Sequence, residues 1–265
     1  MSSLPASLRR AQILEQIQRR GGATVAELAR DHAVSTMTAH RDLEQLAREG
    51  LVERVRGGAR ALAHGTGPHA HPTAWDHRVG QAWAAKAAIA EEAATMIVGG
   101  STIFLDASSS ALALARRLTD EPPYELTLVT NSPIIAAEVR AEQLHVVVCP
   151  GELDQHTRTV AGRWTLEFLR GLRLDTAFVS AAGITVEAGL TTSRGALADV
   201  FNAARGAAAR TIALLDATKF GRASLVSIVA APELDLIVTD PGIDPGVVEA
   251  FGRTGARIRV ALSRS

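Results

Sequence analysis

The chain has 265 residues, of which 47% are hydrophobic and 21% are charged. This composition is typical of a folded globular protein and excludes wholesale disorder, and the length fits one large domain or two modest ones. Since 28 basic residues balance 28 acidic ones, net charge alone does not mark a nucleic-acid or membrane binder. The distribution is uneven: residues 1–62 carry 10 basic and 7 acidic residues (net +3), and the rest carry 18 and 21 (net −3). We therefore expect a mildly basic, polyanion-binding head on an acidic body.

Several classes of site are not expected. Cys149 is the single cysteine, so no disulfide within the chain or cysteine zinc site can form, and its apolar surroundings indicate a buried small hydrophobe. No signal peptide opens the chain and charges interrupt every long apolar stretch, which predicts a cytoplasmic protein. The sequence predicts no cofactor. It also predicts no metal site, because the clustered histidines lack helical ligand spacing and an acidic partner; they are His64, His69, His71 and His77.

The first 62 residues predict three helices and a ribbon. Apolar residues recur at three- and four-residue spacing over 8–17, and Gly21 with Gly22 ends that helix. Thr24 with Glu27 predicts a capping box at the start of a short second helix. A third helix is expected from Ser35, and alternation around the Gly57-Gly58 pair over 51–62 predicts a two-stranded ribbon.

The remaining chain predicts a different architecture. Residues 63–75 are rich in Gly, Pro and His without periodicity, which indicates a linker. From residue 76 short apolar segments alternate with amphipathic ones, the pattern of a mainly parallel, doubly wound α/β sheet covered on both faces. The predicted strands are 102–105, 126–129, 146–149, 176–179, 211–215, 234–238 and 257–261, and the clearest helices are 111–118, 134–140 and 163–169. The predicted domains are therefore 1–62 and 76–265.

The segment 24–43 has the spacing of a helix-turn-helix, whose second helix enters the major groove of DNA. Short polar residues at the start of that helix suit base edges and phosphates, and the ribbon that follows suits a wing on the DNA backbone. The candidate DNA-binding residues are Thr24, Ser35, Thr36, Thr38, His40, Arg41, Arg54 and Arg56. A three-helix protein-interaction module remains the alternative.

Polar residues follow most of the predicted strands of the body. Ligands of doubly wound sheets bind beyond the carboxyl ends of the strands, so these residues are candidates for one site. Hydroxyls and backbone N–H groups at a helix start suit a phosphate, an amide suits a polyol, and a scarce lysine suits the ligand's charge. The candidate effector-binding residues are Asp106, Ser108, Ser109, Ser110, Asn131, Gly151, Gly183, Asp216 and Lys219.

These motifs resemble the DeoR family of bacterial repressors over both halves of the chain. Residues 8–60 are similar to its DNA-binding domain, and residues 76–262 are similar to its sensor domain, a fold shared with ribose-5-phosphate isomerase. The matching motifs include Thr24-Val-Ala-Glu-Leu-Ala29, Arg41-Asp42-Leu43, Val129-Thr-Asn-Ser132, Gly189-Leu-Thr-Thr192 and Asp216-x-x-Lys-Phe-Gly221. The resemblance implies a double-stranded operator, a phosphorylated sugar or polyol as effector, and a homo-oligomer, dimer or tetramer.

The chain departs from the family pattern at several of these positions. His40 follows Ala39 where the family has an arginine after a β-branched residue, and serines at 108–110 replace a glycine and threonines. Leu197 and Phe201 stand where the family usually has an acid and a base. We expect both binding surfaces to persist with altered recognition.

Three functions are compatible with these patterns. The first is a ligand-responsive repressor of a carbohydrate-metabolism operon. The second is a sugar-phosphate isomerase-like enzyme, for which Asp106 or Asp216 would have to act as general base. The third is a protein that binds DNA without any effector.

Overall fold

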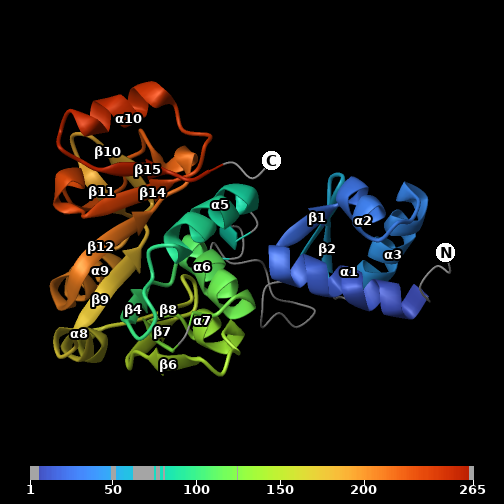
Figure 1. Cartoon of the computed structure of the whole chain (residues 1–265), viewed down its shortest axis with the longest axis horizontal. Helices are drawn as coiled ribbons and strands as arrows, with labels where there is room; N and C mark the ends of the chain where they lie inside the picture. Colours follow the sequence, from blue (N-terminus) through green and yellow to red (C-terminus); the bar gives the residue numbers. More distant parts are fainter. Residues whose placement is uncertain are drawn as a thin grey trace. The chain divides into compact units, whose positions relative to one another are not determined.

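A computed structural model describes residues 6–48, 52–61, 75, 78–79, 81–123 and 125–262. The chain divides into two compact units, Met1–Trp83 and Ala84–Ser265, which are coloured along the sequence in Figure 1. Apart from Trp75, the predicted linker 63–75 lies outside the described residues. The predicted domain boundaries therefore stay a prediction. No helix in the described parts of the chain is long and apolar enough to cross a membrane.

Within residues 6–61, the described part of the first unit packs three helices against a small antiparallel sheet. The helices are α1 (Ala6–Arg20), α2 (Val25–Asp31) and α3 (Thr36–Arg48), and the strands are β1 (Gly22–Thr24), β2 (Val52–Val55) and β3 (Gly58–Ala61), in the order β1-β3-β2. Its core takes one apolar stripe from each helix, with Ile13, Leu28 and Leu43 fully buried. The predicted helices and ribbon are thus confirmed. The strand β1 was not predicted, because Gly21 and Gly22 were interpreted only as the end of the first helix.

The second unit is built on a parallel sheet in the order β15-β14-β12-β9-β4-β5-β6. Its strands are β4 (Thr102–Leu105), β5 (Leu126–Thr130), β6 (Leu144–Val148), β9 (Leu174–Val179), β12 (Ala208–Leu214), β14 (Leu236–Thr239) and β15 (Ile258–Val260). Each predicted strand is present, and the α/β fold class is confirmed. The boundaries differ by at most three residues at either end, because strand ends carry few local signals.

Helices cover both faces of this sheet. They are α5 (Trp83–Ala94), α6 (Ser109–Asp120), α7 (Pro133–Glu138), α8 (Arg163–Arg170), α9 (Gly195–Ala207) and α10 (Pro245–Gly252). In Figure 1, α8 and α9 lie on the opposite side of the strands from α5, α6 and α7. The larger apolar core lies between the sheet and α9, where Phe201 meets Phe104 and Phe251 in one cluster.

The strand order places a topological switch point between β4 and β9. The chain builds β4, β5 and β6 outward to one edge and then returns to the other side of β4 with β9, β12, β14 and β15. At such a point the connections leave the sheet in opposite directions, so a crevice opens beyond the carboxyl ends of the two central strands. The expected position of a ligand in this fold is therefore beyond the ends of β4 and β9.

Short antiparallel strands decorate the sheet and were not predicted. A hairpin joins β7 (Glu152–Asp154) to β8 (Thr159–Ala161), and a separate sheet has the order β10-β11-β13, with bounds Gly183–Thr185, Gly189–Thr192 and Val226–Val229. Two single turns of 3-10 helix, Ala217–Lys219 and Ala231–Glu233, complete the connections. Strands of three or four residues are too short to show alternation, and the glycines that begin β10 and β11 are more typical of loops.

Candidate functional site

The start of α2 is fixed by the predicted capping box. The Thr24 hydroxyl accepts a hydrogen bond from the Glu27 amide at 3.2 Å, and Glu27 Oε2 accepts one from the Thr24 amide at 2.8 Å. The hydrogen bond from the Thr24 backbone, more than that from its side chain, lowers the pKa of Glu27. Thr24 thus sets the orientation of α2 with a hydroxyl that is already engaged.

The amino-terminal half of α3 presents polar side chains to solvent. Ser35 Oγ accepts a hydrogen bond from the Thr38 amide at 3.1 Å, so it satisfies one of the free N–H groups at the start of this helix. Thr36, His40 and Arg41 are exposed, and Thr38 is half-buried. The other face is apolar, with Ala39, Leu43 and Leu46 buried. A helix with one buried face and an exposed polar amino terminus has the form required of a DNA-reading helix.

A buried ion pair holds α3 against α1. Arg9 donates from Nε to Asp42 Oδ2 at 2.6 Å and from Nη2 to Oδ1 at 3.3 Å. The two side chains are only 10% and 5% exposed, and the hydrogen bond to Asp42 raises the pKa of Arg9. Asp42 was quoted in the family motif, but its role was not predicted because its partner lies 33 residues away.

The arginines of the ribbon have three different roles. Arg56 is exposed in the turn between β2 and β3, where Gly57 has a positive φ of 84°. Arg60 forms an ion pair with Glu53 at 2.7 Å. Arg54 is half-buried and its Nη2 lies 3.0 Å from His40 Nδ1 on α3. Arg54 thus connects the wing to α3, Arg56 is the exposed arginine of the turn, and DNA anchoring by either residue stays a prediction.

In the second unit, Asp106 lies at the switch point. Directly after β4, its Oδ1 accepts a hydrogen bond from the Ser108 amide at 3.1 Å and its Oδ2 accepts one from the Ser180 amide at 2.7 Å. Ser180 follows β9, and its hydroxyl donates to Leu214 O at the end of β12 at 2.8 Å. One hydrogen-bonded chain thus joins the carboxyl ends of three adjacent strands. Ser180 was missed because a lone serine after a strand carries no motif.

The serines at the start of α6 are only partly available. Ser108 caps the helix by accepting a hydrogen bond from the Ala111 amide at 3.0 Å. Ser110 is buried, with 3% of its surface exposed, and Ser109 is half-buried. The Ser108 hydroxyl therefore already caps the helix, and this role competes with binding of a phosphate.

Asn131 offers the most distinctive unsatisfied group near this point. It is 1% exposed, and its Nδ2 donates to Val160 O at 3.0 Å. Its Oδ1 is buried without a hydrogen-bond partner among the described residues. Because buried acceptors are nearly always satisfied, an acceptor left open beside the switch point suits a donor from a ligand.

The two candidate glycines are required by the protein's own packing. A side chain at Gly151 would collide with Thr165 Oγ1 and with Ala161 O, and the φ of Gly151 is +149°. A side chain at Gly183 would collide with the backbone oxygen of Arg222. The absence of a side chain at both positions therefore allows close approach of protein atoms, and contact of these glycines with an effector stays a prediction.

Asp216 and Lys219 lie beyond β12. Asp216 is 2% exposed and accepts hydrogen bonds from the amide and the hydroxyl of Thr218. Lys219 is half-buried in the 3-10 turn that Asp216 caps. Asn131 follows β5, which lies three strands from β12 in the sheet, so at a spacing of about 4.8 Å the ends of these two strands are about 14 Å apart.

On α9, apolar side chains occupy the two positions at which the chain departs from the family pattern. Phe201, in the place of a usual base, is 4% exposed and belongs to the apolar core. Leu197 is half-buried on the same helix. The clustered histidines, at which no metal site was expected, lie outside the described residues; they are His64, His69, His71 and His77. The residues that are described contain no cluster of metal-ligating side chains.

The fold and the two surfaces define a winged helix-turn-helix regulator with an α/β sensor. Two family models match it: the DeoR-like helix-turn-helix domain over residues 9–64, and the DeoR C-terminal sensor domain over residues 81–241. The sensor model alone covers more than half of the chain. The protein belongs to the DeoR family of transcriptional regulators.

Full-length relatives agree with this assignment. The chain is 32% identical over 254 residues to the HTH-type transcriptional regulator GolR of Listeria innocua, covering 96% of this chain and 98% of the relative. It is 29% identical to the lactose phosphotransferase system repressor of Lactococcus lactis, covering 91% and 94%. These relatives are regulators, so the chain is not assigned as an enzyme.

The similarity to solved structures is weaker than the similarity to these relatives. The ribose 5-phosphate isomerase A of Neisseria gonorrhoeae is 13% identical, with a TM-score of 0.39 over 57% of this chain and 56% of that one. A likeness of this size carries no conclusion about activity.

Proposed function

We propose that this protein represses a carbohydrate-metabolism operon by binding a duplex operator, and that a phosphorylated sugar or polyol releases it in the cytoplasm. The observation that carries the proposal is the exposed polar start of α3 beside a wing, in a chain whose second unit has a switch point lined by polar groups. The name of the lactose repressor supports the carbohydrate link for a relative, and the proposal extends it here.

The exposed residues at the start of α3 would read the operator. Ser35, Thr36 and Thr38 would contact phosphates or base edges, and Arg41 would contact a guanine edge or a phosphate; the exposure of Ser35, Thr36 and Arg41 supports this assignment. Arg54 can only donate to His40 Nδ1, so the neutral imidazole carries its proton on Nε2. His40 therefore offers a donor to base acceptors such as guanine O6 and N7.

Residues at the carboxyl ends of β4, β5 and β12 would bind the effector. Asn131 Oδ1 would accept from a sugar hydroxyl, the start of α6 with Ser109 and Ser110 would face the phosphate, and Lys219 would balance its charge. Asp106 and Asp216 hold the loops through backbone amides. We retain Gly151 and Gly183 as positions whose backbone borders the site.

Release requires that the effector prefer an arrangement of the oligomer whose heads no longer match the operator half-sites. A shift from mostly bound to mostly free takes a differential affinity of about 5 kcal/mol. DNA binding without an effector is the second candidate, since Ser108 already has a structural role. Calorimetric titration with a panel of sugar phosphates separates the two candidates, because the second predicts no heat from any of them.

The DNA-binding part is tested by Arg41→Ala in a salt-matched gel shift on the mapped operator. Loss of one phosphate contact should reduce the slope of log K against log salt by about 0.9. Loss of a base contact should cost about 1–3 kcal/mol on the cognate site only. Arg140→Ala, at an exposed arginine of the second unit, is the control. Unchanged affinity and slope for Arg41→Ala would remove α3 as the reading helix.

A further inference from the structure

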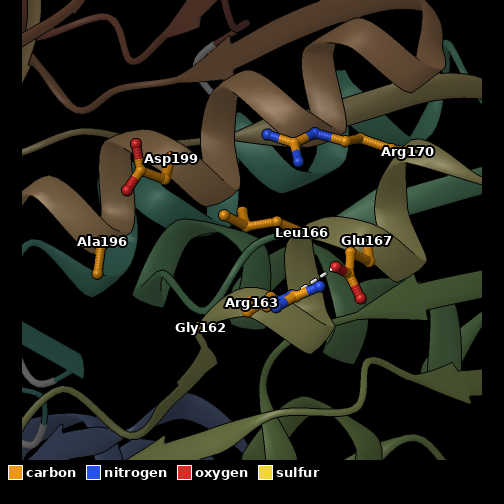
Figure 2. Close-up of a pocket in the computed structure, with 7 residues that line it drawn as sticks. All are labelled: Gly162, Arg163, Leu166, Glu167, Arg170, Ala196 and Asp199. Carbon is orange, nitrogen blue, oxygen red and sulfur yellow. Dashed lines mark hydrogen bonds and ion pairs between the residues drawn. The ribbon is translucent and has the colours of Figure 1, made fainter.

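A groove of about 400 Å³ lies between α8 and α9 on the second unit (Figure 2). None of its lining residues belongs to the candidate effector site. Arg163, Leu166, Glu167 and Arg170 line it from one face of α8, at spacings of three and four residues. Ala196 and Asp199 line it from α9, and a second hollow of about 290 Å³ continues past Arg170 and Asp199.

The groove carries both signs of charge, and one charge of each sign is unpaired. Arg163 Nε contacts Glu167 Oε1 at 2.6 Å, the dashed line in Figure 2. Arg170 and Asp199 are exposed on opposite walls, and neither has a hydrogen bond or ion pair with any residue that the structure describes. Two positive and two negative groups leave no net charge, which does not suit a polyanion such as nucleic acid or an anionic membrane.

Helix α8 also carries an exposed tryptophan, which is not among the residues that line the groove. Trp164 follows Arg163 on α8 and is 65% exposed. Large aromatic side chains are enriched at protein interfaces and supply much of their binding energy. The surface that combines Trp164 with the unpaired Arg170 and Asp199, called here the α8–α9 face, therefore has the composition of a protein contact.

We propose that the α8–α9 face binds the α8–α9 face of a second copy of this chain. In a twofold contact the same surface meets itself, so Arg170 of each copy faces Asp199 of the other, and both unpaired charges gain a partner. Trp164 is covered in the same contact. The choice of a second copy rests in one respect on the proposed function, because a helix-turn-helix that reads two half-sites requires twofold-related heads.

Charge reversal tests this pairing without DNA. Sedimentation equilibrium measures the assembly of the purified full chain, of Arg170→Asp, of Asp199→Arg and of an equimolar mixture of the two variants. Each variant alone places like charges opposite each other twice, so we expect its self-association to weaken about 100-fold and its assembly to fall to half or less. In the mixture the reversed residues meet unlike charges at both contacts, so the assembly should return. Trp164→Ala should also weaken it.

Two controls protect the interpretation. Arg140→Asp reverses an exposed arginine that follows the end of α7, and it should leave assembly unchanged. Far-ultraviolet circular dichroism spectra of both groove variants should match the parent, because the substituted side chains are exposed and unpaired within the part of the chain described.

The proposal is overturned if the parent chain sediments as a monomer, if the single variants assemble like the parent, or if the mixture fails to recover. Each of these results leaves operator binding untouched as a separate measurement. A chain that assembles as expected but binds no operator contradicts the proposed function and not this interface.

Discussion

Replacing Asp42 with alanine should destabilise the first unit severely. The carboxylate is 5% exposed and receives two hydrogen bonds from Arg9, which is itself 10% exposed in its side chain. Removing one member of a buried ion pair leaves the other charge desolvated, at a cost of about 3–5 kcal/mol. Since small domains have about 5–15 kcal/mol of stability in total, Asp42→Ala should leave this unit marginal and abolish operator binding at 25 °C.

The assay is urea unfolding followed by circular dichroism, with operator affinity measured at one salt concentration. The control is Glu53→Ala, which breaks an ion pair whose side chains are 22% and 40% exposed and should cost about 0–1 kcal/mol. Arg9→Met with Asp42→Leu removes both charges and should recover much of the loss. If Asp42→Ala costs no more than Glu53→Ala, the ion pair does not hold α3 in place.

Three further predictions concern single residues. Gly183→Ala should lose about 1–3 kcal/mol in urea unfolding, because the added methyl meets the Arg222 backbone, whereas Gly195→Ala points into open space and should not; equal stabilities would contradict this packing. The lowered pKa of Glu27 means that its stabilisation is present above its ordinary value of 4.5 and is lost as the pH falls through the folded value. Glu27→Gln should therefore flatten the acid side of the stability–pH curve, and an unchanged curve would count against the capping box. Burial raises the pKa of Cys149 to about 12, so only about one thiol in ten thousand is ionised at pH 8, and iodoacetamide should react far faster in urea than in the native protein.

Local features of this fold could be predicted from sequence because their causes lie within a few residues. The capping box needs only Thr24 and Glu27, three positions apart, and β4 coincides with its predicted range because polar residues bound an apolar run. The helix-turn-helix was likewise predictable from spacing, since each helix contributes one apolar face to a shared core.

Features that depend on distant pairing could not be predicted. The link from Arg54 to His40 and the chain from Asp106 through Ser180 to Leu214 join residues 14 to 74 positions apart. The packing at Gly183 shows the same limit, because the Arg222 backbone that leaves no room for a side chain there lies 39 positions away in the chain. The strand order, which locates the switch point, is also set by pairing between distant segments.

The central claim is that an effector at the strand ends controls the grip of the α3 helix on DNA. It is tested most directly by titrating phosphorylated sugars into the operator complex while the melting temperature of the free protein is followed over the same concentrations. The account predicts that one compound raises the melting temperature and lowers operator affinity in the same range. A compound that stabilises the protein and leaves operator affinity unchanged would contradict it.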